Sequence, residues 1–253
     1  MRFASLGSGS RGNALVVEAG ATRVLVDCGF GPRELVKRLA RLGLAPDALD
    51  AVLVTHEHSD HVSGIERCAL RYGLDVFMTH GTFGATGSAA TVGVELFDSH
   101  TVFAIGDLEI CPFPVPHDAR EPVQFVFADG KRRLGVLTDI GHVTPHVVDM
   151  LGACDALFVE CNHDAAMLAA GNYPRALKQR IAGRFGHLDN GAAADLLGRV
   201  NSGRLQHVVC AHISQHNNTV ERAKAALAGV LGCTADWIGA ADQDFGSDWR
   251  SVA

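Results

Sequence analysis

The chain has 253 residues, of which 47% are hydrophobic, and it carries a formal net charge of -6. This composition predicts a globular protein with a large buried core, and the acidic balance excludes a generally basic surface, so any nucleic-acid binding must depend on a local patch. The first residues lack an apolar segment of signal-peptide length, and no later apolar run is long enough to span a membrane, so we expect a cytoplasmic protein without membrane contact.

The first half of the chain contains mainly short strands. Residues 13–28 hold two β-rich runs separated by a glycine-containing turn, which predicts a hairpin. Apolar residues at helical spacing predict a helix over 33–44, and the wholly apolar run 51–55 predicts a short strand covered on both faces. The elements expected next are a helix over 64–74, a strand over 75–80 and several strands over 94–115.

The second half begins with the clearest hairpin of the sequence. It covers residues 122–139, and its two strands are joined at Asp129 and Gly130. From residue 144 onwards the pattern is helix, strand (156–161), helices, strand (207–212) and helix. The sequence shows no repeat, low-complexity segment or change of composition that would mark a linker, so we expect a single domain over 1–253.

Seven cysteines are scattered along the chain without any Cys-x-x-Cys pair, and most lie inside apolar runs. This pattern favours buried thiols in a reducing compartment over a disulfide framework or a cysteine-based zinc site. The thiols therefore agree with a cytoplasmic location.

The stretch VLVTHEHSDH, residues 52–61, places three histidines and an aspartate directly after an apolar run. In an extended segment residues two apart point the same way, so His56 and His58 can converge on one ion, and a following turn can bring Asp60 and His61 to a second. Zinc, iron and manganese accept these ligands, and a catalytic site leaves a position open for water. The alternative is a solvated loop without function.

Six residues cannot fill the coordination spheres of two ions, so further ligands are expected downstream. His117, Asp139 and His212 are the candidates, because each follows an apolar run where a strand would end. Any one of them alone is more often a cap or a turn residue. Their occurrence together, in this order, favours a metal site.

On these residues the sequence resembles the metallo-β-lactamase superfamily of binuclear metallohydrolases. The resemblance covers Asp27 after the first hairpin, the motif 56–61 and the three downstream residues. It implies an α/β fold, a four-layer αββα sandwich with two mixed sheets face to face, helices outside and the metals at one edge. The implied ligands are His56, His58 and His117 for one ion, Asp60, His61 and His212 for the other, and Asp139 between them.

The resemblance also implies a mechanism. Two divalent ions roughly 3.5–4 Å apart can share a hydroxide, lower its pKa toward neutrality and stabilise charge on the attacked group, so hydrolysis is the expected reaction. Asp60 is expected to orient that hydroxide or accept its proton. Asp27 is expected to fix a ligand histidine by accepting its other N–H, although a turn residue is the alternative. The ligand types leave zinc, manganese and iron open.

Four further stretches resemble one bacterial subgroup, the YycJ-type metallohydrolases, across essentially the whole chain; these stretches are 160–164, 173–181, 186–190 and 211–218. This resemblance implies exonuclease action on DNA. The Gly/Ser loop LGSGSRGN (6–13) could form an anion-binding nest, with Ser8 and Asn13 as candidate substrate-binding residues, or it could be a plain turn.

A group of basic residues gives local support for nucleic acid. Arg175, Lys178, Arg180 and Arg184 precede His187 within one predicted helical stretch. Their charges could follow a phosphate backbone, and an ordinary solvated helix face is the alternative. The first three are the candidate contacts to the substrate.

His187 and His163 are the candidates for a catalytic role away from the metals. A phosphodiester leaving oxygen needs a proton or a positive partner, and histidine can supply either near neutral pH. His163 could instead support the wall of the site together with Glu160. Asp189, in the segment GHLDN, stands where the subgroup commonly has a small residue, so its contact with phosphate is left open.

Other functions share parts of this pattern. A small-molecule phosphodiesterase and a thioester hydrolase would both carry the histidine motif, but they disfavour a basic helix near the site. A non-catalytic nucleic-acid-binding module is the alternative of another class, and the intact ligand set argues against it. The sequence therefore predicts a binuclear metal-dependent hydrolase, a phosphodiesterase or exonuclease acting on DNA, and leaves the oligomeric state open.

Overall fold

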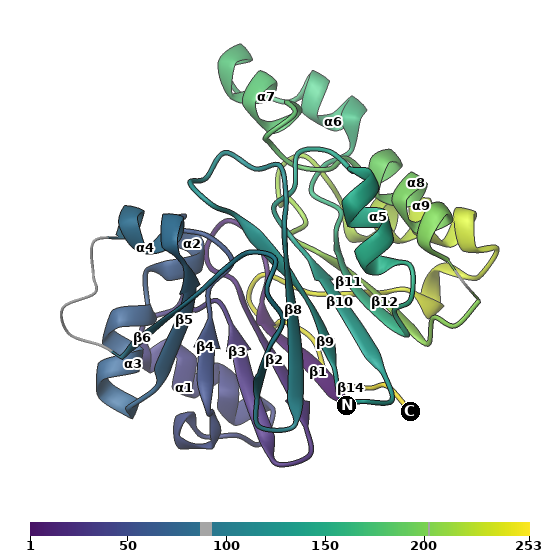
Figure 1. Cartoon of the computed structure of the whole chain (residues 1–253). Coiled ribbons are helices and arrows are strands. Elements are labelled where there is room, and N and C mark those ends of the chain that lie inside the picture. Colours follow the sequence, from purple (N-terminus) through teal and green to yellow (C-terminus); the bar gives the residue numbers. More distant parts are fainter. Residues whose placement is uncertain (87–92, 202) are drawn as a thin grey trace.

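The computed structural model describes residues 1–86, 93–201 and 203–253. Two seven-stranded sheets lie face to face, and helices cover their outer faces (Figure 1). Each sheet is parallel on one side and antiparallel on the other. The predicted α/β class and the four-layer αββα order are therefore confirmed.

The first sheet is built from both ends of the chain. In spatial order its strands are β14 (Arg250–Ser251), β1 (Arg2–Gly7), β2 (Ala14–Ala19), β3 (Thr22–Val26), β4 (Ala51–Leu53), β5 (Asp75–Thr79) and β6 (Val94–Phe97). β2 and β3 form the hairpin expected over 13–28, whereas the pairs from β3 to β6 are parallel. The parallel pairs bring the carboxyl ends of β3 and β4 to the same edge of the sheet.

The second sheet is built from the second half of the chain. In spatial order its strands are β13 (Gly239–Ala240), β12 (His207–Ala211), β11 (Ala156–Glu160), β10 (Arg133–Leu137), β9 (Val123–Ala128), β8 (Leu108–Pro114) and β7 (Phe103–Ile105). β9 and β10 form the hairpin expected over 122–139. The pairs from β10 to β13 are parallel, so the carboxyl ends of β10, β11 and β12 also share one edge.

Helices pack on the outer faces of both sheets. α1 (Pro32–Arg41) and α3 (Ile65–Tyr72) cover the first sheet, and α5 (Pro145–Leu151), α8 (Asn190–Val200) and α9 (Val220–Leu231) cover the second (Figure 1). The shorter helices are α2 (Ser59–Val62), α4 (His80–Thr86), α6 (Ala165–Ala170) and α7 (Arg175–Ile181), with 3-10 turns at Pro46–Ala48 and Ala235–Trp237. In the described part of the chain no helix has both the length and the apolarity to cross a membrane.

The apolar residues form one layer between the sheets and one layer under each set of helices. Phe3, Leu53 and Phe125 lie between the sheets, whereas Leu35 of α1 and Leu197 of α8 are buried in the layers beneath the helices. Because the central strands are covered on both faces, their sequences read as continuous apolar runs rather than alternating ones. The cysteines are free thiols and all except Cys233 are buried, as expected.

The helix predicted from Arg175 to His187 is shorter in the structure. α7 ends at Ile181, and the N–H of His187 then donates to the carbonyl oxygen of Ile181 at 2.8 Å. Gly186 makes this turn possible, because a Cβ atom there would overlap that same oxygen. Arg184 and His187 therefore lie in a loop beyond the helix, and the prediction of one helical stretch was wrong.

Gly29 lies just after β3, where the chain packs against the backbone of the histidine motif. Its neighbour Cys28 donates its backbone N–H to His61 O at 2.8 Å, and its own N–H donates to Asn13 O at 3.0 Å. A Cβ atom at position 29 would overlap the backbone carbonyl oxygen of Asp60. The motif and the β3 loop are thus packed backbone against backbone, with no room for a side chain.

We expect Gly29→Ala to destabilise the protein by about 1–3 kcal/mol, because the motif must move away from the new methyl group. Urea unfolding at constant pH measures the change. Gly84→Ala is the matched control: Gly84 lies in α4 with no heavy atom within 4 Å of a built Cβ atom, so this variant should be as stable as the parent protein or slightly more so. Equal stability of the two variants would contradict the close packing at Gly29.

Candidate metal centre

The histidine motif lies at the edge where strands of both sheets end (Figure 1). His56 and His58 follow β4, and α2 carries Asp60 and His61 in place of the expected turn. From the second sheet, His117 follows β8, Asp139 follows β10 and His212 follows β12. The structure thus brings together all seven residues that the sequence suggested as metal ligands.

Three residues at this edge have an unusual backbone. Asp27, Asp139 and His212 have φ angles of 60°, 53° and 51°, and among the described residues they are the only non-glycine residues with positive φ. The left-handed conformation costs about 1–2 kcal/mol for such a residue. It persists where the surroundings fix the backbone, which is common at functional sites. Here it turns the chain sharply at the ends of β3, β10 and β12.

One donor group consists of His56, His58 and His117, whose ligand atoms lie within 4.8 Å of one another. His58 Nδ1 is 3.3 Å from His117 Nε2. His56 Nε2 is buried and has no hydrogen-bond partner in the described part of the chain. Burial, together with the charge of His61, lowers the pKa of His56 well below its ordinary value, so this ring is neutral, the form that binds a metal.

The second donor group consists of Asp60, His61 and His212. Asp139 links the two groups, because it forms a further donor cluster with His56 of the first and His61 of the second. Its Oδ2 is 3.2 Å from His61 Nε2, and its Oδ1 is 3.1 Å from His212 Nδ1. Asp139 Oδ2 is buried without a hydrogen bond from any described residue. Burial would raise the pKa of Asp139, but His212 and His61 hold it well below its usual value, so it is a carboxylate.

Two buried atoms test whether the site fits a cation: His56 Nε2 and Asp139 Oδ2 have no hydrogen bond from a described residue, although Asp139 Oδ2 is paired by charge with His61. A buried polar atom without a partner is unfavourable, and most are satisfied by protein, water or an ion. His56 Nε2 and Asp139 Oδ2 are electron-pair donors in one cluster of nitrogen and oxygen atoms. A divalent ion bound among them would satisfy both. The donor set therefore fits divalent metal.

The second ring nitrogen of two of the donor histidines is held by an acceptor. His117 Nδ1 donates to Gly186 O at 3.0 Å, and His58 Nε2 donates to Asp118 O at 3.2 Å. Because a carbonyl oxygen can only accept, the proton of each neutral ring must lie on that nitrogen. The other nitrogen of each ring is then free to bind a metal.

Asp27 performs the same task for His61. Its carboxylate accepts from the N–H of Thr55, the hydroxyl of Thr55 and His61 Nδ1, each at 2.8 Å. The structure thus places Asp27 where the resemblance implies it. His61 is fully buried and turns its Nε2 toward Asp139.

Glu160, at the end of β11, organises the second sheet's side of the site. Its buried carboxylate accepts from five donors: the N–H groups of Asp139, Ile140 and Leu188, and the Nδ1 atoms of His187 and His212, at 2.8–3.2 Å. Burial opposes its ionisation, but the two histidines lower its pKa to about 2. Sequence reasoning suggested Glu160 only as part of the wall, because its five partners are distant along the chain.

His187 and His163, the two catalytic candidates, lie in different environments. His187 borders a cavity at the metal edge, the edge of the two sheets where the donor groups lie. Its Nδ1 is held by Glu160 at 2.8 Å, which leaves Nε2 free. His163 is 2% exposed and borders a separate pocket behind His187. Asp189 accepts from the N–H groups of Gly191 and Ala192 and so caps α8, which explains this aspartate without any phosphate contact.

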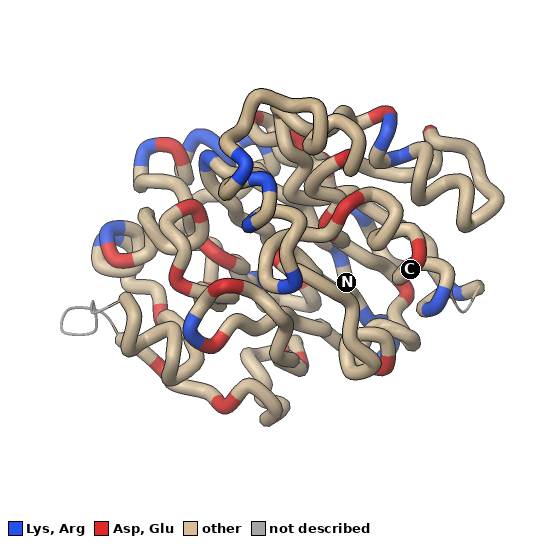
Figure 2. The backbone as a smooth tube through the Cα atoms, turned by 90° about the horizontal axis from the view of Figure 1, so that it is seen from above, with Lys and Arg blue, Asp and Glu red and all other residues tan. Residues whose placement is uncertain are grey.

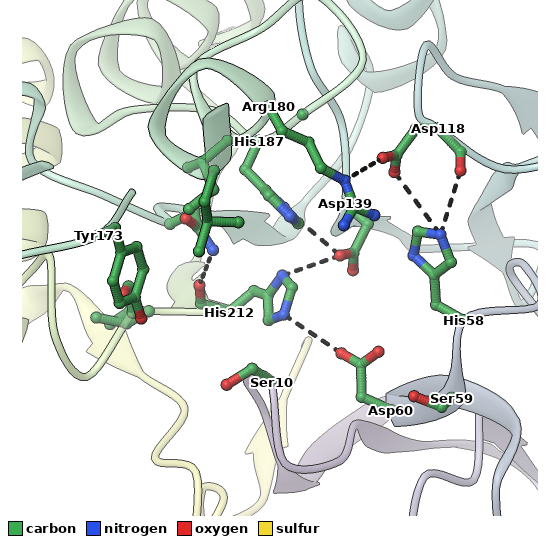
Figure 3. A pocket seen from close by; sticks show the side chains of 16 residues that line it. Ser10, His58, Ser59, Asp60, Asp118, Asp139, Tyr173, Arg180, His187 and His212 are labelled. Carbon is green, nitrogen blue, oxygen red and sulfur yellow. Dashed lines mark hydrogen bonds and ion pairs between the residues drawn. The ribbon is translucent and has the colours of Figure 1, made fainter. Parts of the chain in front are cut away.

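The cavity beside the donor groups has a volume of about 350 Å³. It is bordered by His58, Asp60, Asp139, His187 and Arg180, and Figure 3 shows His187 turned toward Asp139, with His187 Nδ1 3.6 Å from Asp139 Oδ1. His56, His61 and His117 are buried beneath it. A metal bound by these groups would therefore be open to a substrate on one side only.

The two candidate substrate residues of the Gly/Ser loop do not reach this cavity. Ser8 is 3% exposed, and its hydroxyl accepts from the N–H of His212 at 2.8 Å. Asn13 is 6% exposed, and its Nδ2 lies 3.1 Å from Asp60 Oδ2. The loop folds inward because these contacts satisfy the backbone and ligands of the site. Both residues contact members of the second donor group, and Ser10 of the same loop borders the cavity.

The basic candidates also differ in position. Arg180 borders the cavity, and its Nε is 2.6 Å from Oδ2 of Asp118, which the sequence had not singled out (Figure 3). Arg175 and Lys178 lie on the same helix but do not border the cavity, and Lys178 Nζ donates to Ala169 O at 2.6 Å. Only Arg180 is therefore placed to meet a group bound at the metal edge.

A family model described as a beta-lactamase superfamily domain matches residues 22–213. The chain belongs to the metallo-β-lactamase superfamily. It is 34% identical to exodeoxyribonuclease YycJ of Bacillus anthracis over 91% of this chain and 89% of that protein, and 32% identical to exodeoxyribonuclease WalJ of Streptococcus pneumoniae over 91% and 88%. The YycJ-type subgroup is thus confirmed.

Among solved structures, the metallo-β-lactamase fold protein YhfI from Bacillus subtilis superposes with a TM-score of 0.75 at 16% identity, covering 98% of each chain. This likeness concerns the fold. Membership of the superfamily makes the chain a metal-dependent hydrolase, and the clustered histidine and aspartate side chains suit divalent ions.

Asp27→Asn should weaken the binding of Zn²⁺ by about tenfold or more. The amide has one acceptor oxygen instead of two for the donors from Thr55 and His61, and it carries no negative charge to hold His61. Asparagine tolerates the positive φ at this position, so the backbone need not move. Titration of metal-free protein against a chromophoric chelator measures the affinity.

Asp50→Asn is the control for this variant. Asp50 directly precedes β4 of the first sheet; it is exposed, and its carboxylate accepts from the N–H of Arg23 at 2.7 Å. It should bind Zn²⁺ like the parent protein. Equal affinity of all three proteins would show that Asp27 does not support the metal centre.

Proposed function

We propose that this chain is an exonuclease that hydrolyses phosphodiester bonds of DNA with two divalent ions, Zn²⁺ or Mn²⁺. The observation that carries the proposal is the pair of donor groups that share Asp139 and open to one cavity bordered by Arg180. The relatives named exodeoxyribonuclease, similar over 91% of this chain, support DNA as the substrate. The free thiols favour a reducing compartment and hence the cytoplasm.

In this proposal His56, His58 and His117 hold one ion, and Asp60, His61 and His212 hold the other, with Asp139 between them. When bound, the ions would supply an activated water at neutral pH and positive charge for the phosphate oxygens. Glu160 belongs to a cluster with Asp139, His187 and His212, but its five donors already occupy its carboxylate.

Asp60 is the proposed acceptor for the proton of the attacking water. Its side chain is 22% exposed and borders the cavity, while the amide of Asn13 fixes its Oδ2 at 3.1 Å. Burial raises the pKa of Asp60, but the hydrogen bond with His212 and the charge of His61 outweigh this effect and lower it. The group is therefore a carboxylate that can orient a water molecule.

His187 is the proposed partner of the leaving oxygen. Glu160 holds its Nδ1, so the ring cannot rotate freely and its Nε2 is the nitrogen available to the cavity. When the ring is protonated on both nitrogens, the N–H at Nε2 would donate to the developing alkoxide and pass its proton to that oxygen. His163 remains a proposed support behind this ring, in the adjacent pocket.

The cation at the cavity is the proposed phosphate contact. Arg180 presents several N–H donors that suit a phosphate. Arg175 and Lys178 precede it on the same helix and are the proposed contacts to more distant phosphates. Basic and acidic residues are interspersed over the side of the molecule seen in Figure 2, so contact with the DNA backbone is local rather than spread over a basic face. A cation beside the cavity suits a negatively charged phosphodiester better than a neutral thioester.

We expect metal-free protein reloaded with Zn²⁺ or Mn²⁺ to shorten end-labelled DNA stepwise and to hydrolyse bis(p-nitrophenyl) phosphate. Both activities should disappear on chelation and in Asp60→Ala, because that variant loses a ligand and the proton acceptor. Denaturing gels follow the DNA, and absorbance follows the ester.

Asp98→Ala is the matched control, since Asp98 lies in an exposed turn after β6 and should not affect either activity. A fully active Asp60→Ala protein would contradict the mechanism. Hydrolysis of the small ester alone would favour a small-molecule phosphodiesterase, and cleavage of a thioester alone would favour that alternative. DNA binding without any hydrolysis would favour a non-catalytic module.

His187→Ala should reduce DNA cleavage about a hundredfold while leaving bis(p-nitrophenyl) phosphate hydrolysis nearly unchanged. The reason is the leaving group: an alkoxide from DNA needs a proton, whereas p-nitrophenolate leaves without one. Initial rates on both substrates measure the ratio. An equal loss on the two substrates would assign His187 to the support of the metal centre instead.

A further inference from the structure

α6 and α7 form an arm that stands above the metal edge, apart from the two helix layers (Figure 1). α7 has no buried side chain, and α6 buries only Leu168. The arm therefore contributes little to the core. Its sequence must be explained by what it faces rather than by packing.

The side of the arm toward the cavity is apolar. Tyr173, Leu177 and Ile181 are spaced four residues apart and all border the cavity, so they form one stripe along the arm. Figure 3 shows Tyr173 on the side of His212 away from His58. Arg180 borders the same cavity, so a cation lies next to the stripe.

An aromatic ring and aliphatic side chains beside a cation and a hydrolytic centre match the parts of a nucleotide. The phosphate suits Arg180 and the metal centre, and the flat base suits the tyrosine ring. Stacking of a base on an aromatic side chain tolerates any sequence, because every base has a π-face. Inside a duplex these faces are covered by neighbouring base pairs, so a base away from the duplex end must leave the duplex to stack in this way.

We propose that Tyr173, flanked by Leu177 and Ile181, is a platform on which one unpaired base of a DNA strand stacks while the scissile phosphodiester lies at the metal centre. The enzyme then acts on single strands or frayed ends in preference to closed duplex. This inference rests on the proposed DNA exonuclease function and specifies its substrate class.

The test compares single-stranded oligonucleotides that carry one abasic site at successive positions from the labelled end. The parent protein should lose about tenfold in kcat/KM when the missing base is the one that stacks. On the intact strand, Tyr173→Ala should have a kcat/KM about tenfold below that of the parent protein. On that abasic strand, Tyr173→Ala and the parent protein should have equal kcat/KM.

Conservative variants separate the ring from a structural role. Tyr173→Phe and Tyr173→Trp keep a stacking face and should retain activity on single strands, which a role for the hydroxyl would not allow. Phe245→Ala is the control for the loss of an exposed aromatic ring, because Phe245 is 74% exposed and does not border the cavity. It should behave like the parent protein.

Two failures can be told apart. If the parent protein cuts DNA but Tyr173→Ala matches it on every strand, or loses the same factor wherever the abasic site lies, the platform is wrong and the exonuclease function stands. Equal kcat/KM of the parent protein on blunt duplex and single strand would likewise overturn the platform. If the parent protein leaves every oligonucleotide intact, the proposed function fails, and the platform fails with it.

Discussion

The buried carboxylate of Glu160 is the constraint on which the second sheet's side of the site depends. It receives donors from three separate segments, at 139–140, 187–188 and 212. An ionised carboxylate is tolerated in such a place only when its oxygens are fully hydrogen-bonded. Satisfying Glu160 therefore fixes Asp139, His187 and His212 relative to one another before any ion or substrate arrives.

The site also depends on the packing of two sheets. The first sheet supplies the motif 56–61, and the second supplies His117, Asp139 and His212. Neither half offers enough donors for two ions. The apolar layer between the sheets, with Phe3, Leu53 and Phe125, is thus also what brings the two halves together. Folding of the sandwich and formation of the metal centre are one event.

Local patterns explain which features could be predicted from the sequence. Continuous apolar runs predicted the central strands, and polar residues at their ends predicted where the ligands gather, because strand ends share an edge in parallel sheets. Features that depend on distant partners were missed or misplaced. The hydroxyl of Ser8 accepts from the N–H of His212, and Arg180 donates to Asp118. α7 ends at Ile181, whose carbonyl oxygen accepts from the N–H of His187.

The left-handed residues at three strand ends have a consequence for how the protein tolerates change. Asp27, Asp139 and His212 each combine a required side chain with a backbone conformation that suits glycine better. Replacing one of them by glycine relieves local strain but removes a group from the metal edge. Selection for stability alone would therefore erode this edge, while selection for chemistry maintains it at the expense of stability. At these three positions the protein therefore gives up some stability to keep the side chains that the site needs.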